Sequence, residues 1–455
     1  MYEYTNILIL LGLGFFALTA IFRRERALYL IILLLPTYQI RFKVAGIPMT
    51  FLEGMILILA IVEFSSRVLS FPRRRESSEW IPRSSRGMTL FFIFLFLLAA
   101  LISVSTGPNL AKAAGIFKAY FFEAVLFCFL VLLIIDTQKK LRLLFKALTI
   151  LALYLSIFGI YQFITLHGLP YNWWAVDVES RRIVSVLNHP NALALLLGPL
   201  LAMLIFLPYK KKLEWLTITL AVVTLYLSFS RASWLALITT IIVFTLVSWL
   251  RRYVASWRGE RLKERSRLGL KLTAVTLGII FIIIIIPFSR TKILDLARGQ
   301  DPSQQNRYVL WSAAADMLKK NPFLGVGLMG FHEAYKNYPL GPDQVVQNYP
   351  HNFFLNFWVE TGLLGLISII GLLILFFKKV TKLLSTATSG FSPPARGGDE
   401  EGVGERSQMA PFALAAAAGM SMIILHGLVD VSYFKNDLSV LFWLIYSLPF
   451  LSLRA

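Results

Sequence analysis

The segment His351–Gly365 reads HNFFLNFWVETGLLG and follows directly after Pro350. Its polar pair, His351-Asn352, leads into an apolar run that ends near Phe377, which is long enough to cross a bilayer as a helix. The pattern therefore predicts a membrane helix with an imidazole at its mouth. Because an imidazole titrates near neutral pH and can accept a proton from a hydroxyl group, His351 is a candidate catalytic base. The alternative is a histidine that caps the helix at the level of the lipid headgroups.

The composition sets the class of protein. Of 455 residues, 57% are hydrophobic and 15% are charged, and the mean hydropathy is +0.68, whereas soluble domains carry about 25% charged residues. We therefore expect an all-α polytopic membrane protein. The net charge of +20 lies in short clusters between apolar runs, a pattern that sets membrane topology and argues against a nucleic-acid partner. The one cysteine, Cys128, lies in an apolar run, so neither an intrachain disulfide nor a cysteine metal site is expected.

Thirteen apolar runs are candidate membrane spans. They lie near 5–22, 27–40, 50–67, 89–105, 115–135, 147–166, 190–208, 213–230, 232–250, 270–287, 353–377, 411–428 and 438–453. The second run is short and contains Pro36, so we expect about 12–13 transmembrane helices in total. Basic clusters fall in alternate loops, and the positive-inside rule assigns their side of the membrane to the cytoplasm.

This pattern divides the chain into four parts. Residues 1–150 form an N-terminal transmembrane scaffold, and 151–287 form a transmembrane core with an arginine in an outer turn. Residues 288–350 form a large outer loop, and 351–455 form the C-terminal transmembrane helices. Long ordered loops usually bind or catalyse something. Within the large loop, apolar side chains at helical spacing predict an amphipathic helix over 306–320, lying over the bundle and ended by Asn321-Pro322.

Several arginines on the outer side are candidate anion-binding residues. Arg231 lies in the turn Ser230–Trp234 between two spans, where the positive-inside rule does not explain it. Its guanidinium fork fits phosphate oxygens, although the side chain could instead extend to lipid headgroups. Arg307 lies on the loop helix, where a solvated face or an anionic lipid is the alternative. Arg290, Arg298 and the pair Arg181-Arg182 compete for the same role.

Other polar residues near the outer ends of the spans have supporting roles. Asn191 follows Pro190 and is expected to cap the helix that begins there, with His189 a possible second imidazole. Glu360 lies nine residues after His351, about half a turn out of phase, so it is expected to be a structural hydrogen-bonding group. Ionisable groups such as His426 and Asp430 are costly in hydrocarbon and should face the interior, a partner or water.

These residues resemble the signature of the O-antigen ligase and O-antigen polymerase superfamily of bacterial membrane glycosyltransferases. The likeness rests on His351-Asn352, nine residues, Gly362, two residues and Gly365. It extends to Arg181–Ala194, Ser230–Trp234, Asn306–Phe331 and the tail His426–Asp430, in the family's order. The first 150 or so residues are similar only as a hydrophobic scaffold.

The resemblance implies transfer of a glycan from an undecaprenyl-diphosphate carrier to an acceptor hydroxyl at the periplasmic face of the bacterial inner membrane. It also implies a glycosyltransferase-C-like helical fold and no metal or other cofactor. On this basis His351 is expected to be the base, and Arg231, Arg307 and Arg290 are expected to bind the diphosphate. Asn352, Glu360, His426, Asp430 and Arg181 are expected to support them. A single displacement would invert the anomeric configuration.

The acceptor distinguishes the members of such a family. A ligase transfers the glycan to lipid A-core, and a polymerase transfers it to a second lipid-linked glycan. The long outer loop that ends at His351 favours a ligase. A secondary transporter is the alternative class of protein, because such proteins also have many membrane spans. Its ionisable groups, however, should gather at the midplane and not at the outer mouth.

Overall fold

The computed structural model describes residues 2–44, 46–69, 83–169, 181–207, 210–257, 298, 301–338, 346–389 and 400–454. Within these ranges the chain is almost entirely helical, as the apolar runs predict. Five of the described helices have segments long and apolar enough to cross a membrane: Gly87–Thr106, Leu110–Ile134, Gln138–Thr165, Phe353–Ser385 and Met409–Gly427. Three further apolar helical segments are shorter, at Asn6–Phe22, Pro190–Phe206 and Arg231–Val247. The predicted span over 270–287 lies outside the described residues.

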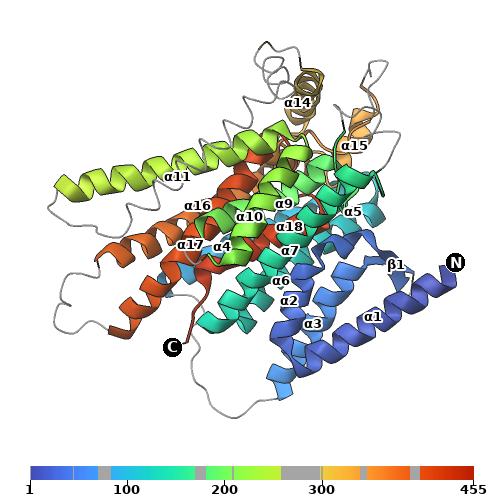
Figure 1. Cartoon of the computed structure of the whole chain (residues 1–455). Coiled ribbons are helices and arrows are strands. Elements are labelled where there is room, and N and C mark those ends of the chain that lie inside the picture. Colours follow the sequence, from blue (N-terminus) through green and yellow to red (C-terminus); the bar gives the residue numbers. More distant parts are fainter. Residues whose placement is uncertain are drawn as a thin grey trace.

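The N-terminal region is blue in Figure 1 and forms one side of the bundle. Its elements are α1 (Tyr2–Phe22), α2 (Arg24–Leu33), η1 (Leu35–Gln39), β1 (Arg41–Val44), β2 (Ile47–Thr50) and α3 (Phe51–Leu69). The second predicted span, 27–40, is therefore wrong as a single helix. Only the ten residues of α2 are α-helical, about 15 Å at 1.5 Å per residue. Pro36 lies in the 3-10 turn that follows, because residues before proline avoid the α conformation.

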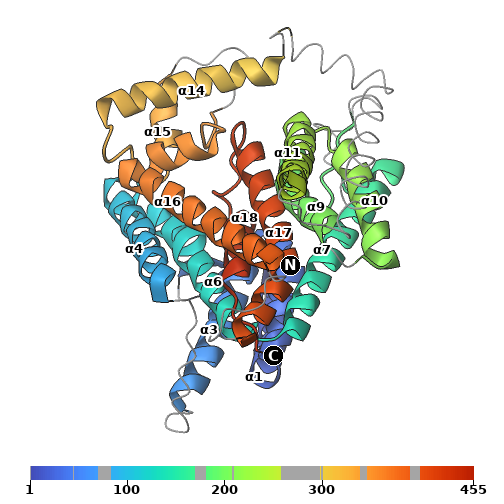
Figure 2. The same cartoon turned by 90° about the vertical axis from the view of Figure 1, so that its left-hand side faces the viewer.

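The remaining elements build the body of the bundle and its outer end. They are α4 (Arg83–Thr106), α5 (Leu110–Ile116), η2 (Phe117–Phe122), α6 (Glu123–Ile134), α7 (Gln138–Thr165), α9 (Pro190–Phe206), α10 (Lys212–Leu227), α11 (Arg231–Trp257), α14 (Pro302–Lys320), α15 (Gly330–Tyr335), α16 (Phe353–Ser389), α17 (Glu400–Gly427), α18 (Asn436–Ser447) and η3 (Leu448–Phe450). The predicted loop helix is confirmed as α14, which lies across one end of the bundle with α15 beneath it (Figure 2).

The centre of the bundle is built from α9, α16, α17 and α18. Every residue of α18 is buried, which is typical of a helix surrounded by other helices. Small residues let α9 and α17 approach closely. A Cβ on Gly198 would lie 2.5 Å from the side chain of Met422, and one on Gly419 would lie 2.6 Å from that of Met203. The helix α16 packs against both α4 and α17.

An aromatic cluster fills the core beneath the outer end of α16. Tyr433 lies at its centre, with ring centroids 5.1 Å from Phe357 and 5.3 Å from Phe442. Its hydroxyl group accepts a hydrogen bond from Trp443 Nε1 (3.0 Å) and donates one to the Tyr120 carbonyl (2.6 Å). These contacts hold the loop between α17 and α18 in place. This loop carries Asp430, which is described next.

Candidate active site

His351 occupies the turn that leads into α16. Its φ is 51°, a left-handed conformation that is uncommon outside glycine and tends to occur where function requires it. The next residue, Asn352, caps α16, because its Oδ1 accepts a hydrogen bond from the Leu355 amide (2.9 Å). Asn352 Nδ2 also donates to the Leu428 carbonyl (2.8 Å), which ties this turn to the end of α17. The imidazole is 30% exposed, so it is held in place and still reaches open space.

The imidazole of His351 pairs with Asp430. Its Nδ1 lies 2.9 Å from Asp430 Oδ1, and its Nε2 lies 3.4 Å from Gln347 Oε1. Burial alone would raise the pKa of Asp430, but the charge and hydrogen bond of His351, with further contributions from His426 and Arg307, hold that pKa well below its usual range. Asp430 is therefore ionised at neutral pH. Because an ionised carboxylate only accepts hydrogen bonds, Nδ1 carries the hydrogen and Nε2 of the neutral ring keeps a lone pair.

Arg307 is brought to this pair by α14. Its Nε donates to the carbonyl of Val429, the residue before Asp430 (2.6 Å), and its Nη1 donates to Ser303 Oγ (2.9 Å). Burial lowers the pKa of Arg307, the negative charges of Asp430 and Asp301 oppose that shift, and the positive charge of Arg231 adds to it. A guanidinium remains charged under these conditions, so a cation from the outer loop lies beside the imidazole pair.

Arg231 reaches the same place from the first turn of α11. It forms an ion pair with Asp301, which in turn caps α14 by accepting a hydrogen bond from the Gln304 amide (3.0 Å). Burial would raise the pKa of Asp301, but the hydrogen bond and charge of Arg231 lower it overall. The turn before Arg231 is fixed by Trp234, whose indole donates to the Leu225 carbonyl (3.0 Å). The two predicted diphosphate-binding arginines, on different helices, are thus joined through one carboxylate.

The adjacent residues Arg181 and Arg182 have different partners, and Arg182, not the predicted Arg181, contacts Asn191 of the cluster. Arg181 donates to the Phe163 carbonyl (3.0 Å) and lies over the Phe163 ring at 5.5 Å. Arg182 instead donates from Nε to the Ser228 carbonyl (2.9 Å) and from Nη2 to Asn191 Oδ1 (2.8 Å). Burial lowers the pKa of Arg182 to about 10, with a further contribution from Arg231 and an opposing one from Asp430.

Asn191 does not cap its helix, contrary to the sequence prediction. His189 is the cap of α9, because its Nδ1 accepts a hydrogen bond from the Asn191 backbone amide (3.1 Å). The side chain of Asn191 is therefore available to the cluster, and its Nδ2 donates to Asp430 Oδ2 (3.2 Å). Burial, followed by the charge of Arg182, lowers the pKa of His189 to about 4, so this imidazole is neutral at pH 7.

Lys435 is a cation that the sequence did not single out. It lies five residues after Asp430, at the start of α18, with Nζ 4.8 Å from the centre of the Tyr38 ring. Burial lowers the pKa of Lys435, and the charges of Asp437 and Asp430 oppose that shift. Its partner Tyr38 comes from η1, almost 400 residues earlier in the chain. Nothing in the local sequence signals this contact.

The remaining predicted residues lie below or beyond the cluster. Glu360 is buried and accepts hydrogen bonds from the backbone amides of Met329 (2.6 Å) and Phe331 (3.2 Å). It does not pair with His351, as expected, and its predicted structural role is supported by these contacts. His426 is buried, and within the described residues its ring nitrogens have no hydrogen-bond partner. Arg290 lies outside the described residues, and Arg298 lies in a described turn, where it is exposed.

The glycines of the signature explain how the outer loop joins α16. Gly362 has φ 70° and ψ −177° inside α16, a conformation that essentially only glycine adopts. The interruption is filled by the loop after α14. The Val326 amide donates to the Val359 carbonyl (2.8 Å), and the Leu363 amide donates to the Phe323 carbonyl (2.9 Å). The loop that carries α14, and hence Arg307, is therefore anchored to the helix that begins after His351.

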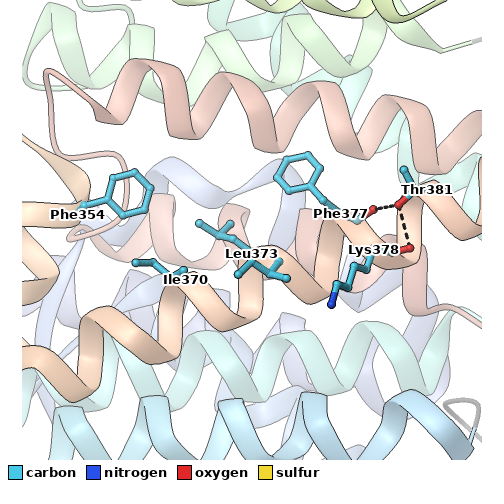
Figure 3. Close-up of a pocket in the computed structure, with 7 residues that line it drawn as sticks. Phe354, Ile370, Leu373, Phe377, Lys378 and Thr381 are labelled. Carbon is cyan, nitrogen blue, oxygen red and sulfur yellow. Dashed lines mark hydrogen bonds between the residues drawn. The ribbon is translucent and has the colours of Figure 1, made fainter. Parts of the chain in front are cut away.

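An apolar cavity of about 730 Å³ lies along α16 (Figure 3). Phe354, three residues after His351, lines one end, and Lys378 and Thr381 line the other. Ile370, Leu373, Ile374 and Phe377 line the length between them. The cavity thus begins one helical turn along the chain from His351 and has an almost wholly apolar wall. A hydrocarbon chain is the kind of ligand that such a wall accommodates.

The cluster as a whole combines a proton acceptor with an excess of positive charge. Among the described residues that meet here, Arg182, Arg231, Arg307 and Lys435 are cations, and Asp301, Asp430 and Asp437 are the carboxylates that face them. Cations therefore outnumber carboxylates by one. No group of three or more His, Cys, Asp or Glu residues within the described ranges could hold a metal ion. The arrangement can bind an anion of multiple charge beside the imidazole of His351.

Comparison with known proteins finds two similarities. Residues 215–370 match a family model described as O-antigen ligase. The exopolysaccharide production protein ExoQ of Rhizobium meliloti (strain 1021) is 25% identical over 307 residues, which cover 65% of this chain and 66% of that protein, just under two thirds of its length. The chain is therefore similar to O-antigen ligases over this matched region.

The O-antigen ligase match covers part of the cluster. Arg231, Arg307, His351 and the interruption at Gly362 lie inside residues 215–370. The partner of His351, Asp430, lies sixty residues beyond the matched region. The site is therefore completed by the loop between α17 and α18, a part of the chain that the family model does not include.

Proposed function

We propose that this protein transfers a glycan from an undecaprenyl-diphosphate carrier to an acceptor hydroxyl at the periplasmic face of the inner membrane. The observation that carries the proposal is the meeting of the His351–Asp430 pair with Arg307 at the outer end of a helical bundle. The family supports a polysaccharide-related, glycan-transferring membrane enzyme. The chemistry of the cluster supports a donor whose leaving group carries several negative charges.

The proposed reaction is a displacement at the anomeric carbon of the donor sugar. The acceptor hydroxyl attacks the anomeric carbon, a new C–O bond forms, and the bond between that carbon and the diphosphate oxygen breaks. The hydroxyl proton passes to Nε2 of His351, and Asp430 stabilises the resulting imidazolium through Nδ1. The charge that develops on the diphosphate is stabilised by Arg231 and Arg307. A single displacement of this kind inverts the anomeric configuration.

The surplus of cations supports the binding of a diphosphate in particular. A lipid diphosphate ester carries about two negative charges, the cluster has a surplus of positive charge, and the planar guanidinium fork binds phosphate oxygens in pairs. The apolar cavity along α16 supports the same donor, because it begins three residues from His351 and could accommodate part of the carrier's hydrocarbon chain. We propose that the reaction needs no metal, since arginine side chains serve the leaving group. Activity that EDTA abolishes and Mg²⁺ or Mn²⁺ restores would contradict this point.

The acceptor is proposed to be lipid A-core, as in an O-antigen ligase. Polymerisation is the second candidate, and the similarity to an exopolysaccharide production protein favours it, because the name of that protein does not refer to lipopolysaccharide. The test is to supply purified protein and one lipid-linked glycan with either lipid A-core or excess lipid-linked glycan. Extension of lipid A-core alone supports ligation, and growth of lipid-linked chains alone supports polymerisation. Extension of neither would refute the proposed transfer.

The periplasmic orientation is tested by thiol labelling. The one natural cysteine, Cys128, is buried, so the wild-type protein provides a low background. Tyr308 on α14 is exposed, and so is Lys382 near the far end of α16. We expect a membrane-impermeant maleimide to label Tyr308→Cys in cells with a permeabilised outer membrane, and to label Lys382→Cys only after the inner membrane is opened. The opposite pattern would place the cluster in the cytoplasm and refute the proposal.

A further inference from the structure

We propose that Asn191, held by Arg182, is a positioning residue that sets the orientation and charge of the His351–Asp430 pair. The kinetic consequences of this inference rest on the proposed function. Arg182 Nη2 donates to Asn191 Oδ1 (2.8 Å), and Asn191 Nδ2 donates to Asp430 Oδ2 (3.2 Å). The amide therefore connects a cation to the carboxylate that holds the candidate base.

The orientation of this amide is fixed by its two neighbours. A guanidinium has only donors, so the atom that faces Arg182 must be the oxygen of Asn191. An ionised carboxylate has only acceptors, so the atom that faces Asp430 must be the nitrogen. An Asp or a Leu at position 191 could not make both contacts. The requirement is thus for an amide, and a side chain of similar size is not enough.

Both oxygens of Asp430 are used. Oδ1 faces His351 Nδ1 (2.9 Å) and also accepts from the Val431 amide (2.8 Å). Oδ2 is held by Asn191. With both oxygens held, the carboxylate plane cannot rotate freely, and the ring of His351 is aligned through Nδ1. The alignment of Nε2 toward an acceptor hydroxyl then depends on a residue that does not touch the substrate.

The supports of Asn191 are rigid. It lies in the first turn of α9, which is almost entirely buried and packs against α17. Arg182 is anchored by its second hydrogen bond, to the Ser228 carbonyl (2.9 Å). The cap of α9 is supplied by His189, so the Asn191 side chain is not needed to begin the helix. The contacts with Arg182 and Asp430 therefore explain the orientation of the Asn191 side chain.

Removal of the amide should change the charge balance at Asp430. In the wild-type protein the Asn191 N–H group and the positive charge of Arg182 behind it partly neutralise the carboxylate. Without the amide donor Asp430 attracts the imidazolium form of His351 more strongly. The acid limb of the pH–rate profile should then move to higher pH, because the base is lost to protonation earlier. A purely structural role would leave the position of this limb unchanged.

The experiment compares Asn191→Leu and Asn191→Asp with the wild type in the full-length protein in nanodiscs. The substrates are a synthetic polyprenyl-diphosphate-linked saccharide and the acceptor that the wild type extends. For Asn191→Leu we expect kcat to fall about 10- to 100-fold, the donor KM to stay within about twofold, and the acid limb to rise by about 0.5–1 pH unit. For Asn191→Asp, which keeps the partner of Arg182 and adds a second carboxylate beside Asp430, we expect a larger rise.

Asn356→Leu is the matched control. Asn356 is also a buried asparagine, one turn along α16 from Asn352, and within the described residues its side chain has no hydrogen-bond partner. We expect this substitution to leave the position of the acid limb unchanged. A wild-type kcat and pH profile for Asn191→Leu would overturn the proposal. A fall in kcat with an unmoved acid limb would overturn it as well, since that result indicates a structural role.

A readout that does not need turnover separates this inference from the proposed function. The chain has five histidines, so ¹⁵N-histidine NMR with a His351→Gln variant for assignment can follow one ring. We expect the nitrogen shifts of His351 to show the imidazolium form persisting to a higher pH in Asn191→Leu than in the wild type. Unchanged nitrogen shifts would overturn the positioning role. If the wild type transfers no glycan, the proposed function fails, and these shifts still decide the role of Asn191.

Discussion

Asp430→Asn tests the role of the imidazole pair most sharply, because it removes a charge and preserves the shape. In the wild type the carboxylate accepts from His351 Nδ1, from the Val431 amide and from Asn191 Nδ2. An amide at position 430 can accept on one side only. Its NH₂ group must face either Asn191 Nδ2, which is a donor, or His351 Nδ1, which accepts only in the tautomer that carries its hydrogen on Nε2. In the first orientation a donor–donor contact replaces a hydrogen bond, and in the second the imidazole loses the lone pair of Nε2.

The size of the effect follows from the bond that is lost. A hydrogen bond to a charged group contributes about 1.5–3 kcal/mol, and this range corresponds to about 10- to 150-fold in rate if it acts on the transition state. The donor KM should stay the same or fall, because removal of a carboxylate increases the positive surplus around the diphosphate. A lower kcat without a higher donor KM is the expected signature.

The assay measures initial rates of acceptor extension by purified variants, with the donor concentration varied. Asp316→Asn is a matched control, because Asp316 lies on the exposed surface of α14 and pairs only with Lys319 among the described residues (2.8 Å). We expect Asp316→Asn to retain wild-type kinetics. A kcat for Asp430→Asn within about twofold of the wild type would refute the reasoning, since that difference corresponds to less than about 0.5 kcal/mol.

Three further predictions test other parts of the site. Arg231→Lys keeps the charge and loses the guanidinium fork, so the donor KM should rise about tenfold with a smaller change in kcat; an unchanged KM in initial-rate measurements would argue against diphosphate binding. Because the pKa of His189 is lowered to about 4 by burial and by Arg182, the neutral ring stabilises the fold above about pH 6.5, and this stability should decline as the pH falls toward 4. Thermal unfolding between pH 7 and pH 4 checks this, and His189→Asn should flatten the decline; equal slopes would contradict it. Gly362→Ala places a Cβ 2.4 Å from the Phe323 carbonyl oxygen at positive φ, so it should lower the free energy of unfolding by about 1–3 kcal/mol; a wild-type Tm would show that the interruption of α16 is not required.

Much of the fold could be predicted from the sequence because it follows from the length of apolar runs. The helices α4, α7, α16 and α17 lie where hydropathy predicts them, and α14 begins only a few residues before its predicted start. The hairpin of β1 and β2 was not predicted. Its strands are four residues each and largely exposed, so they carry no hydrophobic periodicity. The interruption at Gly362 also gives no signal in hydropathy, since its cause is a backbone conformation.

The candidate site could be predicted only in part. His351, Arg231 and Arg307 were identified because each residue type is unusual at its place in the topology. The choice between Arg181 and Arg182 could not be made, because the direction of a side chain in an irregular segment depends on its tertiary partners. The role of Asn191 was predicted from its position after Pro190, a local rule that the competing cap of His189 overrides.

The central claim is that one site at the outer end of the bundle binds a lipid diphosphate and uses His351 to activate the acceptor. Single-turnover transfer by His351→Ala, preloaded with a polyprenyl-diphosphate-linked saccharide and then mixed with acceptor, tests it most directly. The account predicts donor binding within about threefold of the wild type and a transfer rate lower by about 100-fold or more. Transfer by His351→Ala at the wild-type rate would contradict the account.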